Sequence, residues 1–369
     1  MLYFSKLRIT FVSLICLFFI LITTFNFIKF DHDLFKKKIN LGLDLQGGSY
    51  LLLEIDNSPV IEQRLQNLTS IIRNYFKEKN IRVSNFKITN QTLSFSVDEQ
   101  FKQIVIDDFK DENSEINPYY PRFKSHQLDL LETDDTLNLE FSRQGIIELK
   151  TSSQDQALEI VRRRIDEIGT NEPNILKRGN DRILVELPGL DDPARIKSLL
   201  GKTANLTFQF VASNENDSFG TEVLKFDNGL DEAIVSKRII LSGDNLVDAK
   251  PSMNSQTNET VVSFTLDRVG AKKFGKATSS GVGKRLAIVL DGKIISAPTV
   301  REPIIGGSGQ ISGNFTFQSA TDLALLLRSG ALPAPLNIIE ERTVGPDLGQ
   351  DSIDAGILSL IIGFILVVL

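Results

Sequence analysis

The chain has 369 residues, of which 41% are hydrophobic and 24% are charged, and its formal net charge is -6. This composition is typical of a folded protein of two or three domains and argues against a disordered chain. A duplex-binding surface needs clustered Lys and Arg, so the acidic balance argues against nucleic acid as the main partner. The single cysteine, Cys16, lies in an apolar run, which excludes an intrachain disulfide and argues against a thiolate nucleophile.

An apolar segment over residues 7–28 is the first expected element. Its side chains are nearly all apolar after Arg8, and about twenty such residues can cross a bilayer as a helix. The segment ends in residues 25–30, which lack the small side chains of a signal-peptidase site. We therefore expect residues 1–30 to hold an uncleaved transmembrane anchor, with a cleaved signal peptide as the alternative. Basic residues on both sides of it leave its orientation open.

The first strand is expected within residues 41–56, where a short apolar run follows Gly47 and Gly48. Residues 57–150 then carry the pattern of a small α+β module. Its expected elements are a helix over 60–79, strands over 81–88 and 92–97, an acidic loop over 107–121 and an alternating segment over 136–149. The range 31–150 is therefore expected to combine the first strand of a base domain with a long insertion.

Residues 151–211 are expected to supply the rest of this base domain. A capping box at Ser153 and Gln156 predicts the start of a helix, and Gly169 predicts its end. The next expected elements are a strand over 174–177, a turn over 179–181, a strand over 183–187 and a helix from the N-cap Asp192, through Pro193, to Gly201.

A last strand is expected over residues 204–210, where apolar and polar side chains alternate. Leu206 and Phe208 are expected in a core, with Thr207 and Gln209 in water. With the strand of residues 41–56, the order becomes strand, helix, strand, strand, helix, strand. This is the ferredoxin-like, or split βαβ, unit.

A second module is expected over residues 212–309. It begins with a polar segment that suggests a domain boundary, followed by an alternating strand over 261–266 and a helix over 269–278. Its clearest signal is a hairpin that joins 286–290 to 294–295 across Asp291 and Gly292. The glycines of the next break are the hinge candidates Gly306, Gly307 and Gly309.

Residues 310–350 are expected to return the chain to the base through a strand over 310–313, a helix over 317–329 and a strand over 336–344. The helix side chains expected to face inward are Phe317, Ala320, Leu323, Ala324 and Leu327. Residues 351–369 are then expected to begin a second transmembrane helix. Only about thirteen apolar residues remain where a span needs about twenty, so we expect the chain to be a fragment of a longer membrane protein.

The search for catalytic residues finds no constellation. Only His32 and His126 are available, so a metal site or a His-dependent triad is not expected. The glycines over 281–283 and 307–313 fail the spacing of phosphate and dinucleotide loops, and Asp192 is explained as a helix cap. The basic face over 162–164 is expected to be solvated, and the anchor holds no acidic or His side chain for a proton relay. We therefore expect no catalytic, metal or cofactor-binding residue and a protein that is not an enzyme.

Six motifs together resemble those of the SecD subunits of the bacterial Sec protein translocase, in the SecD/SecF family. They lie in that family's usual order over residues 41–48, 164–173, 181–189, 290–298, 325–333 and 343–349. The motif positions are Asp44, Gly47, Gly48, Arg164, Glu172, Pro173, Asp181, Arg182, Glu186, Pro188, Gly189, Asp291, Gly292, Pro298, Gly330, Gly345, Pro346 and Gly349. The insertion over 57–150 matches the family only loosely.

The resemblance implies an α+β fold with a ferredoxin-like periplasmic base and a mobile periplasmic head, between transmembrane helices. It also implies a multi-pass protein of the bacterial inner membrane that works with SecF beside the SecYEG channel. In that family the proton motive force helps to complete preprotein translocation after the ATP-dependent SecA step, and the head holds unfolded preprotein. The Asp that serves proton movement belongs to a later helix, which is absent from this chain.

Two other classes of function remain open from the residues alone. The glycine-rich break suggests a membrane-anchored periplasmic domain that binds a small ligand or acts as a sensor. An anchored hydrolase would need a nucleophile and a base, and the sequence offers no clear pair.

Overall fold

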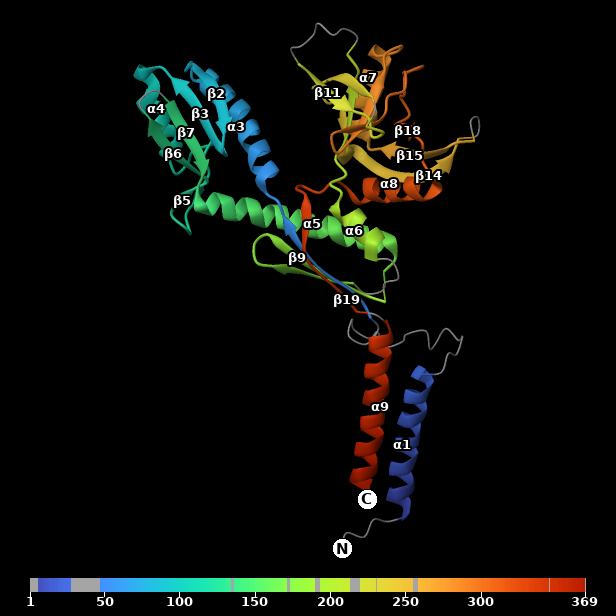
Figure 1. Cartoon of the computed structure of the whole chain (residues 1–369). Helices are drawn as coiled ribbons and strands as arrows, with labels where there is room; N and C mark the ends of the chain where they lie inside the picture. Colours follow the sequence, from blue (N-terminus) through green and yellow to red (C-terminus); the bar gives the residue numbers. More distant parts are fainter. Residues whose placement is uncertain are drawn as a thin grey trace. The chain divides into compact units, whose positions relative to one another are not determined.

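The computed structural model describes residues 6–27, 47–133, 136–170, 173–189, 193–212, 220–229, 231–254, 258–344 and 346–368 (Figure 1). The expectations for Asp44, Glu172, Asp192 and Gly345 lie outside these residues. The chain forms two compact units, one of residues 1–48 with 344–369 and one of residues 49–343.

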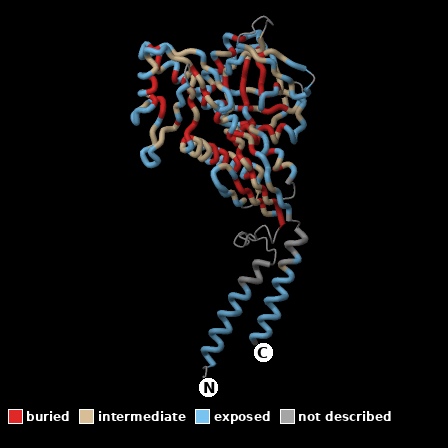
Figure 2. The backbone as a smooth tube through the Cα atoms, turned by 60° about the vertical axis from the view of Figure 1, so that its left-hand side comes forward, coloured by how far each residue is buried: buried red, intermediate tan, exposed pale blue. Residues whose placement is uncertain are grey.

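The first unit holds the two terminal helices, α1 (Lys6–Phe27) and α9 (Pro346–Val368). Nearly all the large apolar side chains described on both helices are exposed, as the pale-blue tubes of Figure 2 indicate, with Leu7 at 81% and Leu360 at 74%. Within the described residues, no helix is both long and apolar enough to cross a membrane.

The base is built from six elements of the second unit. In chain order they are β1 (Gly48–Ile55), α5 (Arg143–Ile168), β8 (Asn174–Arg178), β9 (Arg182–Pro188), α6 (Pro193–Gly201) and β19 (Leu336–Val344). The strands pair in the order β19-β1-β9-β8, which is that of a ferredoxin-like sheet. Apolar side chains of α5 and α6 pack on this sheet and form its core.

The strand expected to complete the base sheet belongs to another sheet. β10 (Leu206–Phe210) pairs with β13 (Leu241–Ser242) and β16 (Leu286–Leu290), while β19 takes the place beside β1. The polar face of β10, which we expected in water, is covered, since Thr207 is 9% exposed and Gln209 is 4% exposed. Alternation indicates a strand but does not say which sheet the strand joins, and this part of the prediction was wrong.

The N-cap of helix α5 lies eleven residues before the predicted cap at Ser153. This N-cap is Ser142, whose hydroxyl accepts a hydrogen bond of 3.0 Å from the Gly145 backbone N–H. Ser153 is 3% exposed and lies inside the helix, so the capping-box prediction was wrong. The predicted end is confirmed, because Gly169 caps the helix with a φ of 79° in the left-handed region.

Replacing Ser142 by alanine is therefore expected to destabilise the protein by about 1 kcal/mol, because the helix loses the acceptor for one of its first backbone N–H groups. Ser153→Ala is the matched control: inside the helix it removes a buried hydroxyl but gains the higher helix propensity of alanine, so we expect a change of less than about 0.5 kcal/mol in the free energy of unfolding. Urea titration of both variants measures the difference. A larger loss for Ser153→Ala would place the start of α5 where the sequence pattern does.

The insertion between β1 and α5 is a separate α+β module. Its elements are α3 (Ser58–Glu78), β2 (Val83–Thr89), β3 (Thr92–Val97), α4 (Glu99–Lys110), β4 (Tyr119–Tyr120), β5 (Ser125–His126), β6 (Leu128–Thr133) and β7 (Thr136–Phe141). The main sheet has the order β2-β3-β7-β6. The expected helix and strands at 60–97 are confirmed. The helix α4 was missed, although it buries Val105, Ile106 and Phe109 at helical spacing.

The head follows α6 in the chain. After β10 come β11 (Thr221–Lys225), β12 (Glu232–Ser236), β13 (Leu241–Ser242), a short 3-10 helix (Gly243–Asn245), β14 (Leu246–Met253), β15 (Thr260–Leu266), α7 (Arg268–Ser280), β16 (Leu286–Leu290), β17 (Lys293–Ser296), β18 (Ser308–Ile311) and α8 (Phe317–Ser329). The main sheets have the orders β13-β10-β16-β17 and β14-β15-β18. Phe208, Phe264 and Phe274 meet in the core, with ring centroids 5.5 to 6.3 Å apart.

The segment expected as a return to the base is divided. β18 pairs with β15, and α8 places Ala320, Leu323, Ala324 and Leu327 in the same apolar core as Phe208. Only β19 reaches the base sheet. The expected inward position of Phe317 was wrong, because its side chain is 65% exposed.

The expected hairpin of the head is confirmed. Strands β16 and β17 pair in antiparallel fashion. Asp291 and Gly292, which join them, both have positive φ, at 50° and 77°. This is the backbone of a type I′ turn, for which the Asp-Gly pair is a preferred sequence.

Candidate functional site

The hinge candidates lie inside the head. Gly309 pairs with Phe264 in the sheet, and a Cβ at Gly309 would lie 2.5 Å from the Phe264 ring. Gly307 has a φ of 69°, and its carbonyl accepts a hydrogen bond of 2.7 Å from the Leu266 N–H. Gly306 has open space around it. Because two of these glycines are held within the head, they do not form a hinge between head and base.

The connection between base and head is instead centred on Arg164, a motif position on α5. Arg164 is fully buried, and its guanidinium donates hydrogen bonds to four backbone carbonyls. The acceptors are Leu199 at 2.7 Å, Lys202 at 2.5 Å, Thr203 at 3.2 Å and Gly330 at 3.2 Å. The prediction of a solvated basic face fails at this residue, while its neighbours Arg162 and Arg163 are exposed.

The buried cation of Arg164 is compensated by helix ends rather than by a bonded carboxylate. Leu199 lies in the last turn of α6, and Gly330 is the C-cap of α8. Carbonyls at a helix C-terminus lack intrahelical partners and carry partial negative charge. Burial lowers the pKa of Arg164, and the negative charge of Asp291 raises it by a smaller amount, so that the pKa is about 10. The side chain therefore stays charged at physiological pH.

Asp291, at the tip of the β16–β17 hairpin, holds the chain as it enters the head. It accepts a short hydrogen bond from the Thr203 hydroxyl, and its carboxylate accepts backbone N–H bonds from Ala204 at 3.1 Å and Asn205 at 2.8 Å. Its own N–H donates to the Asn205 carbonyl at 3.0 Å. The motif positions Arg164, Asp291 and Gly330 are thus brought together through the same short segment.

Two ion pairs connect α8 of the head with the base beside this cluster. Arg195 of α6 lies 2.8 Å from Asp322, and Glu167 of α5 pairs with Arg328. All four side chains are between 22% and 36% exposed, so solvent screens both pairs. None of these residues was singled out from the sequence, because a charge on an amphipathic helix gives no sign of a partner far along the chain.

A cavity of about 600 Å³ opens in the head next to this cluster. Its apolar wall comes from three parts of the head, and its side chains are Phe226, Leu290, Ile295, Phe315, Leu323 and Leu326. Charged side chains also line it, among them Lys202, Lys293 and Asp322. Asp291 lines the cavity as well, so the cavity and the connection to the base share residues.

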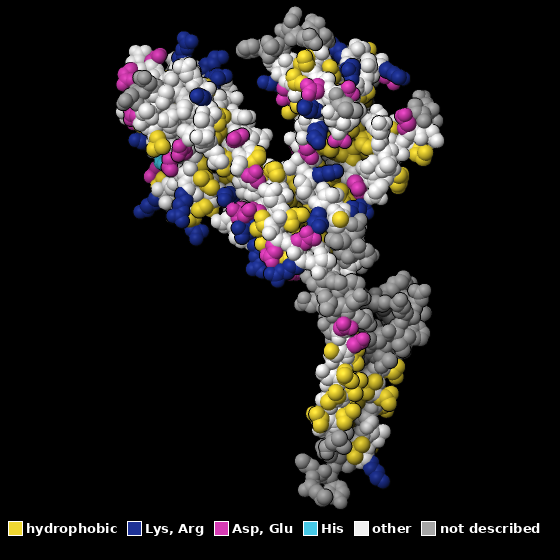
Figure 3. Space-filling model, viewed as in Figure 1, with side chains coloured by type: hydrophobic (Ala, Val, Ile, Leu, Met, Phe, Trp, Pro, Cys, Tyr) yellow, Lys and Arg dark blue, Asp and Glu magenta, His cyan; other side chains and the backbone are white. Residues whose placement is uncertain are grey.

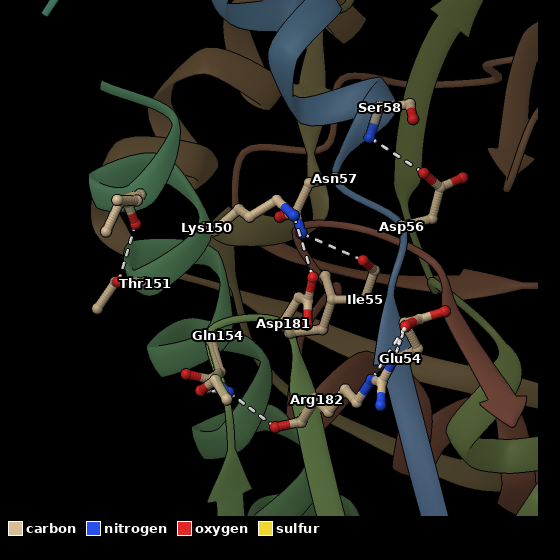
Figure 4. A network of polar contacts seen from close by, with 12 residues as sticks. Glu54, Ile55, Asp56, Asn57, Ser58, Lys150, Thr151, Gln154, Asp181 and Arg182 are labelled. Carbon is tan, nitrogen blue, oxygen red and sulfur yellow. Dashed lines mark hydrogen bonds and ion pairs between the residues drawn. The ribbon is translucent and has the colours of Figure 1, made fainter. Parts of the chain in front are cut away.

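A second group of motif positions lies at one end of the base sheet (Figure 4). Asp181 pairs with Lys150 of α5 at 3.0 Å, and Arg182 pairs with Glu54 of β1 at 3.0 Å. Gln154 of α5 donates to the Arg182 carbonyl at 2.7 Å. These contacts connect α5, β1 and β9, so Asp181 and Arg182 serve the architecture of the base.

The remaining motif positions fall at the ends of elements. Gly47 and Gly48 have φ values of 71° and 138° at the start of β1, and Gly189 has a φ of 63° after β9 ends at Pro188. Glu186 of β9 accepts a hydrogen bond of 2.7 Å from Asn174. The other described positions are Pro173 before β8, Pro298 after β17, and Pro346 and Gly349 in the first turn of α9. Most of these positions lie where a strand or a helix begins or ends.

Among the described residues, no group of three or more His, Cys, Asp or Glu side chains is placed to hold a metal ion. The candidate site consists of an apolar cavity with charged residues in its lining and a polar connection to the base.

Comparison with known proteins places these features in a family. The description "SecDF, P1 head subdomain" matches residues 221–334, "Protein translocase subunit SecDF, P1 domain, N-terminal" matches 154–213, and "SecD/SecF GG Motif" matches 34–59. A protein translocase subunit SecD of Rickettsia bellii is 40% identical over 96% of this chain and 68% of its own length. That of Acetobacter pasteurianus is 40% identical over 99% of this chain and 71% of its own length.

A solved structure agrees with this match. A crystal structure of SecDF in a super-membrane-facing form has a TM-score of 0.51 and 28% identity, and it covers 97% of this chain and 38% of that one. The predicted resemblance is thereby confirmed by sequence and by fold. The chain belongs to the SecD family of protein translocase subunits, the SecDF-type accessory components of protein translocation.

Proposed function

We propose that the head of this protein binds unfolded preprotein as it leaves the SecYEG channel, and that the base passes the movement of the head to the membrane. The observation that carries the proposal is the cavity of about 600 Å³ in the head. Its aromatic and aliphatic wall can accept apolar side chains of many sequences. The charged residues in its lining can form hydrogen bonds with a polar backbone.

We further propose that α1 and α9 fasten the protein to the bacterial inner membrane, with the base and head in the periplasm. Figure 3 supports this, since hydrophobic side chains gather on the described parts of both helices, while charges of both signs cover the base and head. Helices with such apolar surfaces are expected for a membrane anchor. SecF is the partner through which the proton motive force would reach the base.

Photocrosslinking tests the binding role. A benzophenone-bearing phenylalanine analogue in place of Phe226, in the cavity wall, is expected to crosslink to a stalled preprotein in membrane vesicles. The matched control is the same analogue in place of Phe123, which is 50% exposed on the insertion module. Labelling from Phe123 or from the base position Leu176, without labelling from Phe226, would contradict binding in the head.

A further inference from the structure

The base and the head are joined by two chain segments that lie side by side. One leaves α6 through residues 202–205, and the other returns from α8 through residues 330–332. The Leu332 N–H donates a hydrogen bond of 2.8 Å to the Thr203 carbonyl, so the two segments are bonded to each other. A movement of the head relative to the base has to pass through both.

Thr203 has contacts with the returning segment, with the base and with the head. Its carbonyl accepts hydrogen bonds from Leu332 and from Arg164 of the base, and its hydroxyl donates to Asp291 of the head. The next residue, Ala204, is buried and has a φ of 60°, which is uncommon for a residue with a side chain. The outgoing segment is therefore held from the base by Arg164 and from the head by Asp291.

The Arg164 side chain contacts both segments through hydrogen bonds of its own. Its donors reach Lys202 and Thr203 on the outgoing segment and Gly330 on the returning one. A planar guanidinium offers five N–H donors in a fixed fork, while a lysine ammonium offers three and lacks this geometry. The arrangement needs an arginine rather than any cation.

The ion pairs beside Arg164 differ from it in burial. Arg195–Asp322 and Glu167–Arg328 are partly exposed, and water can replace either partner. The guanidinium of Arg164 is buried, and breaking its bonds would leave a charge and several carbonyls without partners. The two exposed ion pairs can therefore break and re-form when the head moves, whereas the hydrogen bonds of Arg164 are expected to persist.

We propose that Arg164 is a positioning residue that forms the pivot of the head, holding both connecting segments while the two exposed ion pairs set the angle of the head. This proposal is about the connection between head and base, and it does not depend on which ligand the head binds. Its failure and the failure of preprotein binding would therefore appear in different experiments.

The test measures the distance between base and head in the full chain. Nitroxide labels are placed at Leu176 in β8 and Val223 in β11, both exposed, in a Cys16→Ser background. Pulsed electron paramagnetic resonance is expected to show a distance distribution at least about twofold wider for Arg164→Lys, because the ammonium cannot hold both segments. Arg163→Lys, on the exposed face of the same helix, is the matched control and is expected to keep the original width.

Two further measurements separate a pivot from a general loss of stability. Labels at Val223 and Met253, both in the head, are expected to keep their distance distribution in Arg164→Lys. Asp291→Ala, which removes the contact from the head side, is expected to widen the base-to-head distribution as well. An unchanged base-to-head width in Arg164→Lys, or equal widening within the head, would overturn the proposal.

Discussion

Replacing Phe208 by alanine is expected to cost about 3–5 kcal/mol of stability, the largest loss among the single changes considered for the head. The Phe208 ring is 1% exposed and packs against Phe264 and Phe274, with centroids 5.6 and 5.5 Å away. Its removal leaves a cavity between two sheets that share this core. Urea titration of the full chain, with unfolding followed by circular dichroism, measures the loss.

Phe317→Ala is the matched control for this prediction. Phe317 belongs to the same part of the chain, but its side chain is 65% exposed. Its removal is expected to change the free energy of unfolding by less than about 0.5 kcal/mol. Similar losses for the two variants would contradict the burial of Phe208 in the core of the head.

Gly309→Ala is expected to destabilise the head by about 1–3 kcal/mol, because the added methyl group overpacks the core. The new Cβ would lie 2.5 and 2.9 Å from two ring atoms of Phe264, whose side chain is 3% exposed and cannot move away freely. The loss follows from the contact alone, since the φ of Gly309 is not in the left-handed region. Thermal unfolding of the full chain measures the loss.

Gly306→Ala tests the other reading of these glycines. No atom lies within 4 Å of a Cβ at Gly306, so this variant is expected to be as stable as the original chain. If the glycines formed a hinge, both substitutions would change the movement of the head with little loss of stability. A stable Gly309→Ala variant would therefore contradict the packing described for β18.

Local signals in the sequence predicted local structure well. The Asp291-Gly292 turn has the positive φ values that this pair favours, and Gly169 ends α5 in the left-handed region. The helix α8 was predicted from spacing, and four of its five inward side chains are in the core. In each case the residues that decide the structure are close together in the chain.

These local signals could not predict contacts between residues that are far apart in the chain. The strand β10 has the same alternation whether it joins the base or the head, and only the finished sheets show that β19 completes the base. Ser153 with Gln156 imitates a cap, but the helix had already begun at Ser142, where the bond to Gly145 forms. Arg164 belongs to a basic run that is solvated at its other two positions, so its burial depends on α6 and α8 arriving around it.

Strand β19 pairs with β1 but is synthesised after the insertion and the head, which affects how the base can fold during biosynthesis. The ribosome must release the whole insertion and the whole head before the sheet that began with β1 can close. The head, by contrast, is a continuous stretch whose two ends are bonded to each other at Thr203 and Leu332. Because the chain enters and leaves the head at adjacent points, the head interrupts the base as an insertion whose length can vary without separating the strands of the base sheet.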